Sequence, residues 1–212
     1  MVKVFGLKGM PPNVAELETE PSRPLLIGAC WALQPIATLI TTFLLAHVLF
    51  GLLAQSASGA SLNIQNAYTE IYFSPKGGAE TAISRNIREA TEDINVLAYS
   101  FTSDYICDSL ILAYKKGVHI RVILDKSQLT AKNSKIQRLK DAGIPLYIDY
   151  TQAIAHNKVI IIDRRIVITG SYNFTKSAEE RNAENLLIIH SCSLSAKYLQ
   201  NFELHLEHAR AE

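Results

Sequence analysis

Residues 156–173 read HNKVIIIDRRIVITGSYN and contain two runs that are rich in β-branched side chains. The runs lie at 159–162 and 166–169, and the polar residues 163–165 separate them. Two such runs joined by a short polar turn predict a β-hairpin. The hairpin would bring the residues that precede the first run close to those that follow the second.

The predicted hairpin sorts its polar residues between two faces, because successive side chains of a strand point to opposite sides. His156 and Lys158 are two residues apart and should share a face, whereas Asp163 should point the other way. Ser171 and Asn173 are also two residues apart, so the return strand can deliver a hydroxyl and an amide to the same place. We therefore expect the chemistry beside His156 and Lys158.

Strand and helix patterns alternate on both sides of the hairpin. Alternating or short apolar runs predict strands, and apolar residues spaced three and four apart predict helices. The predicted strands lie at 71–73, 94–99, 119–125, 146–149 and 185–189, and the predicted helices at 79–91, 105–116, 132–141 and about 194–208. This order predicts an α/β fold with a mixed β-sheet flanked by helices.

An apolar segment precedes this domain. No Asp, Glu, Lys or Arg occurs from Pro24 to Thr69, and residues 25–54 are almost entirely apolar. As a helix this run would be roughly 45 Å long, enough to cross a hydrocarbon core of about 30 Å. We therefore predict a hydrophobic leader and linker over residues 1–60 and a separate domain over residues 61–212.

The fate of the leader has two main interpretations, a cleaved signal peptide and a retained signal anchor. The small residues at 54–60 offer several cleavage sites, which favours removal. The length of the run and its interruption at Gln34-Pro35 favour retention as a membrane anchor, and a buried core helix is a third interpretation. Because the cationic flank stays in the cytoplasm, either a cleaved or a retained leader places the domain outside it, periplasmic, secreted or membrane-anchored.

The composition excludes several classes of protein. The 212 residues include 21 Lys or Arg and 20 Asp or Glu, so a net charge of +1 names no partner. With 48% hydrophobic and 19% charged residues the chain is too apolar to be disordered. Its three cysteines are too few for a disulfide scaffold or a four-thiolate zinc site, and a Cys107–Cys192 disulfide stays open.

The polar groups of residues 156–173 suit a phosphodiester. A phosphodiester repels anionic nucleophiles, and its transition state spreads negative charge over the non-bridging oxygens. A neutral imidazole can attack phosphorus and form a covalent intermediate, while a lysine and amide or hydroxyl donors bind the oxygens in place of a metal ion. The leaving oxygen needs a proton, which a second imidazolium could supply.

The runs HNKVIIID and GSYNFTKSAEERNAEN resemble the HKD signature of the phospholipase D superfamily, in particular its small single-motif Nuc-type endonucleases. The segments IYFSPKGG, LAYSFTS, RVILD and AGIPL occur in the order typical of that branch. The resemblance covers roughly residues 71–209 and implies a phospholipase D-like fold.

The resemblance implies a role for each motif residue. His156 matches the nucleophilic histidine, and Lys158, Ser171 and Asn173 match the groups that bind the phosphate. Glu184 matches the carboxylate that hydrogen-bonds and orients the histidine. Asp163 matches the aspartate of the motif, to which we assign a structural role. No metal ion and no cofactor is implied.

The chain carries the motif once, whereas larger members of the family carry it twice. His119-x-Arg121 with Asp125 has the wrong spacing for a second copy and reads as a core strand. We therefore expect a homodimer with its active site at the two-fold interface, where one histidine attacks and the other protonates the leaving oxygen.

These features predict a metal-independent phosphodiesterase, a non-specific endonuclease acting on DNA or RNA through a phosphohistidine. A lipid phosphodiesterase acting on membrane phospholipids is the alternative, which a retained anchor would favour. A catalytically silent nucleic-acid binder would need a broken site, and every expected group is present.

Two further groups of residues have open or structural interpretations. The stretch 115–140 contains eight Lys or Arg against one acidic residue, which suits either a groove for nucleic acid or a solvated face. The spacing of His190, Cys192, His205 and His208 fits no zinc pattern, so we interpret them as residues of a terminal helix face.

Overall fold

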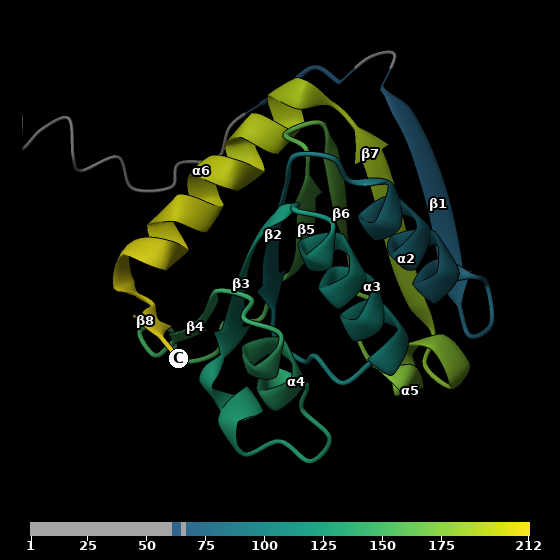
Figure 1. The fold of residues 1–212 in the computed structure, drawn as a ribbon. Coiled ribbons are helices and arrows are strands. Elements are labelled where there is room, and N and C mark those ends of the chain that lie inside the picture. Colours follow the sequence, from purple (N-terminus) through teal and green to yellow (C-terminus); the bar gives the residue numbers. More distant parts are fainter. Residues whose placement is uncertain (1–60, 65–66) are drawn as a thin grey trace, which may run out of the picture. The chain divides into compact units, whose positions relative to one another are not determined.

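The computed structural model describes residues 61–64 and 67–212, which Figure 1 shows as a ribbon. The predicted leader over residues 1–60, with its hydrophobic run at 25–54, lies outside the described residues. In the part that is described, no helix has the length and apolar character needed to cross a membrane. The predicted boundary at residue 60 stays a prediction.

One mixed sheet of eight strands runs through the described residues in the order β1-β7-β6-β5-β2-β3-β4-β8. Strands β2, β3 and β4 are parallel, and every other neighbouring pair is antiparallel. The strands are β1 (Tyr68–Ser74), β2 (Asp93–Ala98), β3 (His119–Asp125), β4 (Leu146–Asp149), β5 (Lys158–Ile162), β6 (Ile166–Gly170), β7 (Glu184–His190) and β8 (Arg210–Ala211). The predicted α/β fold with a mixed sheet is confirmed.

Strands β5 and β6 form the predicted hairpin. Their register pairs Val159 with Thr169. Asp163 and Arg164 form the turn with φ of 49° and 53°, in the left-handed region. All five side chains of β5 are buried because β5 lies in the middle of the sheet with helices on both sides. A strand buried on both faces reads as a continuous apolar run, as 159–162 does.

Helices cover the two faces of the sheet unequally (Figure 1). One face packs against α2 (Ala79–Glu89), α3 (Asp104–Lys115), α4 (Ile136–Asp141) and α5 (Lys176–Glu180), which together bury the larger core. The other face packs against α6 (Cys192–His208), whose Phe202 is buried against Leu97 and Ile161. The sheet is therefore the middle layer of three.

The predicted helix over 132–141 is partly wrong. The structure has a 3-10 turn at Lys126–Leu129 and a short α4 that begins at Ile136. Asn133 adopts a left-handed φ of 66°, and the backbone N–H of Lys135 donates to Phe101 O at 3.1 Å. These features hold the chain outside the helical conformation before Ile136. The two-residue strand β8 and the five-residue α5 carry too short a pattern to be predicted.

The end of the chain closes one edge of the sheet. Strand β8 pairs with β4, where Ala211 lies opposite Tyr147. The backbone N–H of Glu212 adds a hydrogen bond to Leu146 O at 2.9 Å. This pairing satisfies backbone groups of β4 that would otherwise face solvent.

The candidate site is positioned by strand ends that meet at one edge of the sheet. These are the carboxyl ends of β2, β3, β4 and β6 and the amino ends of β5 and β7, as the register of the pairs requires. Ala98 at the end of β2 lies opposite Lys158 at the start of β5. Every candidate site residue except Asp163 lies at this edge.

Candidate active site

His156 and Lys158 lie together at the start of β5, on either side of Asn157. The His156 side chain is exposed, and its ring centroid lies 4.6 Å from that of Tyr99. Lys158 is only 8% exposed, and its Nζ lies 5.2 Å from the centre of the same Tyr99 ring. Tyr99 is anchored by its backbone N–H, which donates to Asn157 O at 2.8 Å. The imidazole of His156 and the ammonium of Lys158 therefore both lie against the ring of Tyr99.

The ammonium of Lys158 has few protein partners for a buried cation. Its Nζ donates to His156 O at 2.9 Å. Burial lowers the pKa of Lys158, and the negative charge of Glu184 opposes this shift without cancelling it. A partly desolvated ammonium binds an anion more strongly than a hydrated one does. The lysine is therefore suited to hold a phosphate oxygen beside the imidazole.

Gly170 and Ser171 end β6 next to this pair. A Cβ on Gly170 would lie 2.3 Å from Asn185 O, so only glycine allows β6 to approach β7 this closely. The Ser171 Oγ accepts hydrogen bonds from the Asn185 backbone N–H at 3.0 Å and Nδ2 at 3.4 Å. Ser171 therefore holds the start of β7 in place, and its hydroxyl proton can be donated to another acceptor.

Asn173 carries a buried polar atom without a protein partner. Its Oδ1 is buried and makes no hydrogen bond within the described residues. The next residue, Phe174, is held in place because its carbonyl accepts from Thr102 N at 2.9 Å and Ser103 N at 3.0 Å. An unsatisfied buried amide oxygen costs free energy, which a bound group with a donor would recover.

Glu184 lies at the start of β7, and its expected hydrogen bond to His156 is absent from the described residues. Its Oε1 accepts from Asn182 Nδ2 at 3.0 Å instead. Strand β6 separates β7 from β5, which keeps the two side chains apart within one chain. Glu184 acts on Lys158 through its charge. The implied hydrogen bond is therefore not made among the described residues of one chain, and the role of Glu184 stays a prediction.

Asp163 lies at the opposite end of β5 from His156 and makes structural contacts. Its carboxylate accepts from Thr91 Oγ1 at 3.0 Å and from the backbone N–H groups of Thr91, Glu92 and Asp93 at 2.8–3.2 Å. Burial alone would raise the pKa of Asp163, but these hydrogen bonds lower it below the usual value. The carboxylate therefore anchors the hairpin turn to the start of β2.

A family model described as "Cardiolipin synthase, PLD-like domain" matches residues 83–206, which include all of these side chains. The chain belongs to the phospholipase D superfamily. The PLD-like domain is similar in structure to the phospholipase D family member Nuc from Salmonella typhimurium, with a TM-score of 0.67 and 33% identity. That match covers 69% of this chain and 99% of Nuc.

Relatives of the PLD-like domain carry lipid-related names. A "Phospholipase D" of Rickettsia prowazekii is 46% identical over 130 residues, which are 61% of this chain and 63% of that protein. The "Mitochondrial cardiolipin hydrolase" of Homo sapiens is 32% identical over 127 residues, which are 58% of this chain and 50% of that protein. The match thus spans less than two thirds of the length of these relatives.

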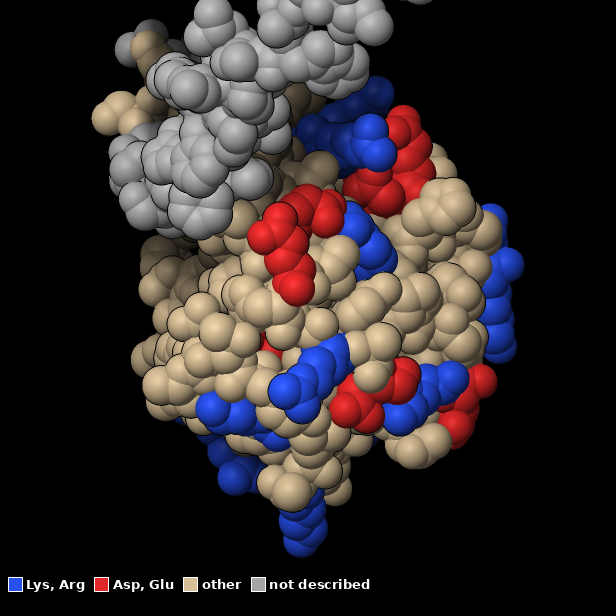
Figure 2. All heavy atoms as spheres, turned by 90° about the vertical axis from the view of Figure 1, so that its left-hand side faces the viewer, with Lys and Arg blue, Asp and Glu red and all other residues tan. Residues whose placement is uncertain are grey.

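The basic stretch of the PLD-like domain does not form one continuous cationic wall. Arg121 pairs with Glu203, Lys135 and Arg138 pair with Asp104, and Lys140 pairs with Glu212. Arg121 also lies near the start of β3, at the edge opposite His156. Figure 2 shows basic and acidic side chains interspersed on the side that lies at the left of Figure 1. These contacts favour the solvated-face interpretation for much of the stretch.

Two hollows lie on opposite edges of the PLD-like domain. One of about 740 Å³ is lined by residues at the starts of β2 and β3, including Asp93 and His119, far from His156. The other, of about 620 Å³, is lined by Thr102, Lys176 and Arg181 among others and adjoins the segment that follows Asn173. None of the candidate site residues lines either of these two hollows, and the lining of the second mixes acidic and basic side chains.

The sequence analysis missed two features of the PLD-like domain. Tyr99 was expected only as the end of a strand, and nothing in its spacing shows that it lies against His156. The terminal-helix interpretation is confirmed for Cys192, His205 and His208 but is wrong for His190, which ends β7. It also missed that the rings of His205 and His208 both contact Asp149. Asp149 lies 56 residues before His205 in the chain, so spacing could not reveal the cluster.

Proposed function

We propose that the PLD-like domain is a metal-independent phosphodiesterase, and specifically an endonuclease of low sequence specificity. The observation that carries the proposal is the exposed imidazole of His156 beside the buried ammonium of Lys158. The exposed ring can reach a polymeric substrate, and the ammonium can neutralise its phosphate. Asn173 follows β6 at the same edge, where the N–H groups of its amide can donate to a second phosphate oxygen.

In the first step a ring nitrogen of His156 attacks phosphorus. The nitrogen–phosphorus bond forms as the bond to the leaving oxygen breaks, and that oxygen takes a proton from an imidazolium. Lys158 donates to a non-bridging oxygen whose negative charge grows in the transition state. The product is a phosphohistidine and one released strand end.

In the second step water attacks the phosphohistidine. The imidazole that gave up its proton takes one from the water, and the nitrogen–phosphorus bond breaks. This regenerates the neutral His156 ring and releases the second strand end as a phosphate monoester. Both steps need two imidazoles, one covalent and one for proton transfer.

The second imidazole is the partner subunit's His156 in a two-fold homodimer. One chain carries one HKD motif, and His156 is exposed at the edge of the sheet, where a second copy can approach it. A two-fold axis beside this edge would bring the two copies of His156 together in one active site. The same axis offers Glu184 a histidine other than its own, since the carboxylate makes no hydrogen bond to His156 within one chain and accepts from Asn182 Nδ2 instead.

The lipid phosphodiesterase is the second candidate, and the names of the relatives favour it. The Rickettsia protein is named phospholipase D, and the human one is named mitochondrial cardiolipin hydrolase. A retained hydrophobic leader would bring the domain to a membrane surface. The motifs of the Nuc-type branch and the structural likeness to Nuc favour nucleic acid. In either case the domain acts outside the cytoplasm.

The substrate is tested with the full chain purified in mild detergent. Supercoiled plasmid DNA, RNA and vesicles that contain cardiolipin or phosphatidylcholine are incubated with it in excess EDTA. We expect nicking of DNA or cleavage of RNA, and no products from the His156→Ala variant. His119→Ala is the matched control, because His119 is exposed at the opposite edge. Hydrolysis of phospholipid alone would contradict the endonuclease proposal and support the lipid phosphodiesterase.

The shared site is tested with mixed dimers of wild-type and His156→Ala chains. A mixed dimer holds one imidazole at the axis and cannot supply both nucleophile and acid. We expect its activity to fall to the level of the His156→Ala homodimer. Half or full activity in the mixed dimer would show that each chain works alone.

A further inference from the structure

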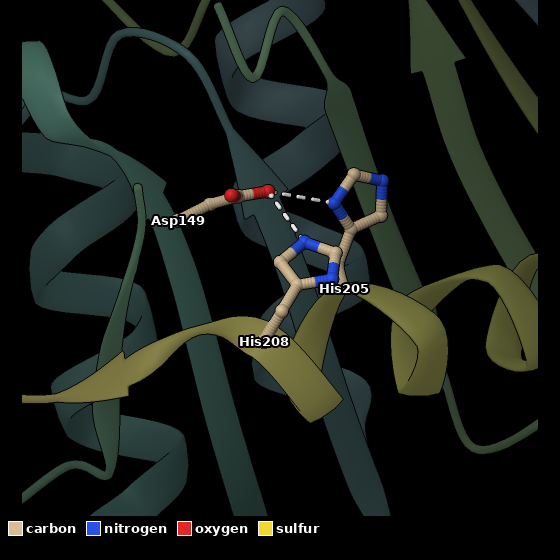
Figure 3. A group of neighbouring side chains, drawn as sticks. All are labelled: Asp149, His205 and His208. Carbon is tan, nitrogen blue, oxygen red and sulfur yellow. Dashed lines mark hydrogen bonds and ion pairs between the residues drawn. The ribbon is translucent and has the colours of Figure 1, made fainter. Parts of the chain in front are cut away.

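Three side chains converge on one point away from His156, as Figure 3 shows. Asp149 is the last residue of β4, and its Oδ2 lies 2.8 Å from His205 Nδ1 and 3.2 Å from His208 Nε2. The three atoms all lie within 4.8 Å of one another. No step of the proposed phosphodiester cleavage uses these groups.

The fold holds this cluster in place from both sides. His205 and His208 are three residues apart in the last turn of α6, so their rings leave the same face of the helix. The Asp149 side chain is fully buried, and its Oδ1 accepts from Thr151 N at 2.9 Å and Gln152 N at 3.3 Å. These backbone donors fix the carboxylate and leave Oδ2 directed at the two rings.

We propose that Asp149, His205 and His208 bind a divalent transition metal of the zinc class. Two imidazole nitrogens and one carboxylate oxygen are the ligands that zinc prefers, and a fourth position is left for water. Metal–ligand bonds of 2.0–2.2 Å in tetrahedral geometry place ligand atoms about 3.3 Å apart. The present contacts of 2.8 and 3.2 Å need to open by only a few tenths of an ångström.

The position also suits a cation electrostatically. The last turn of α6 carries unsatisfied carbonyls and the negative end of the helix dipole, which stabilises positive charge. The buried Asp149 carboxylate supplies a full negative charge, while the side chains of His205 and His208 are 15% and 31% exposed. The outer side of the cluster is therefore open to an entering ion.

Each ring must present a bare nitrogen to the metal. The single proton of a neutral ring then moves from the nitrogen that faces Asp149 to the other one. No redox change and no further reactant is involved. Binding weakens in acid, because protonation of both nitrogens of a ring removes its lone pair.

The site would join α6 to the loop that leads to His156. This loop begins after Asp149, and its far end is held where Ala155 N donates to Asp125 Oδ2 at 2.8 Å. A bound ion would therefore stabilise the fold and position the loop, without taking part in the chemistry. At saturating zinc we expect the Tm to rise by about 5–10 °C over the metal-free protein.

The test measures metal bound to the full chain, after EDTA treatment and exchange into chelator-free buffer. We expect one Zn²⁺ per chain by elemental analysis and a visible d–d band of tetrahedral Co²⁺. His205→Gln and His208→Gln should each weaken binding by more than the roughly 100-fold that loss of an outer partner causes. His119→Gln, at the opposite edge of the sheet, is the matched control and should bind like wild type.

A ligand-retaining variant separates a metal site from a set of hydrogen bonds. His208 is the more exposed of the two histidines, with 31% of its side chain exposed, so it is the one to replace with cysteine. The Co²⁺ form of His208→Cys should gain the intense near-ultraviolet band of a thiolate ligand. Absence of this band, or equal metal binding by wild type and His205→Gln, would overturn the proposal. So would failure of the wild-type chain to bind either ion. Because metal content is the readout, the result does not depend on the proposed nuclease activity.

Discussion

The ammonium of Lys158 donates a hydrogen bond to the backbone carbonyl of His156 at 2.9 Å. One cation thus holds the backbone of the residue whose ring is the proposed nucleophile. In a substrate complex the same ammonium has two further N–H donors for phosphate oxygens. Under the proposed function, Lys158 would therefore both position the imidazole and bind the phosphate.

Lys158→Met should separate activity from stability. The side chain is buried and the fold lowers its pKa, so a neutral chain of similar length removes an unfavourable charge. We expect the Tm to stay level or rise while kcat falls by about 100- to 1,000-fold. Thermal unfolding and single-turnover cleavage measure the two effects. A large fall in Tm would mean that the bond to His156 O dominates.

The lowered pKa of Lys158 also predicts how the difference in unfolding free energy between wild type and Lys158→Met depends on pH. Between its folded pKa and its unfolded value, Lys158 binds more protons unfolded than folded, so stability rises with pH through this window. The Met variant lacks this gain. The free energy of unfolding of Lys158→Met, measured by urea denaturation, should therefore fall relative to that of wild type as the pH rises into the alkaline range. A difference that does not change with pH would contradict the idea that burial of the Lys158 charge costs free energy.

Asp163→Asn should lower stability and spare the reaction. The variant loses acceptors for the backbone N–H groups of Glu92 and Asp93 or leaves them poorly paired. We expect a loss of about 1–3 kcal/mol in the free energy of unfolding at neutral pH. Urea denaturation measures it, and kcat of the folded protein should stay within a few-fold of wild type. An inactive but fully folded variant would place Asp163 in the chemistry.

Acid should remove the advantage of Asp163 over asparagine. Because its folded pKa is below the unfolded value of about 3.9, its contribution is present above that pH and is lost as the pH falls through the folded pKa. The difference in unfolding free energy between wild type and Asp163→Asn should therefore shrink below about pH 4. A difference that persists in strong acid would point to packing as its cause.

Tyr99→Ala should slow cleavage, whereas Tyr99→Phe should not. The ring contacts both the His156 ring and Lys158 Nζ, and phenylalanine keeps that aromatic wall. Loss of the ring lets both groups move, and we expect kcat/KM to fall by about 10- to 100-fold. Equal losses in both variants would instead assign the role to the hydroxyl.

Gly170→Ala should damage the site more than Gly117→Ala does. The new methyl group at 170 would overlap Asn185 O. A methyl group at 117 would meet no atom within 4 Å, so that substitution costs only the strain of a positive φ of 94°. We expect a loss of more than about 2 kcal/mol at 170 and about 1 kcal/mol at 117. Urea denaturation of the two variants gives the comparison.

The hairpin and the order of most strands and helices followed from local sequence patterns, whereas the roles of the motif residues rest on the family resemblance and stay predictions. The run at 159–162 is apolar because β5 is buried on both faces, and such a run is visible without any partner. The break before Ile136 depends on the contact of Lys135 N with Phe101 O, which no local pattern records. Asp149 meets His205 through tertiary packing alone. Contacts between segments that lie far apart in the sequence could therefore not be predicted.

The two-residue strand β8 has a practical consequence for anyone who handles the protein. Both of its residues are exposed, and among the described residues the edge of β4 is covered by residues 210–212. Proteolytic loss of these residues would uncover a strand edge that can pair with another chain. Mass spectrometry that checks for residues 210–212 is therefore a sensible step before any aggregate is attributed to the apolar residues 25–54.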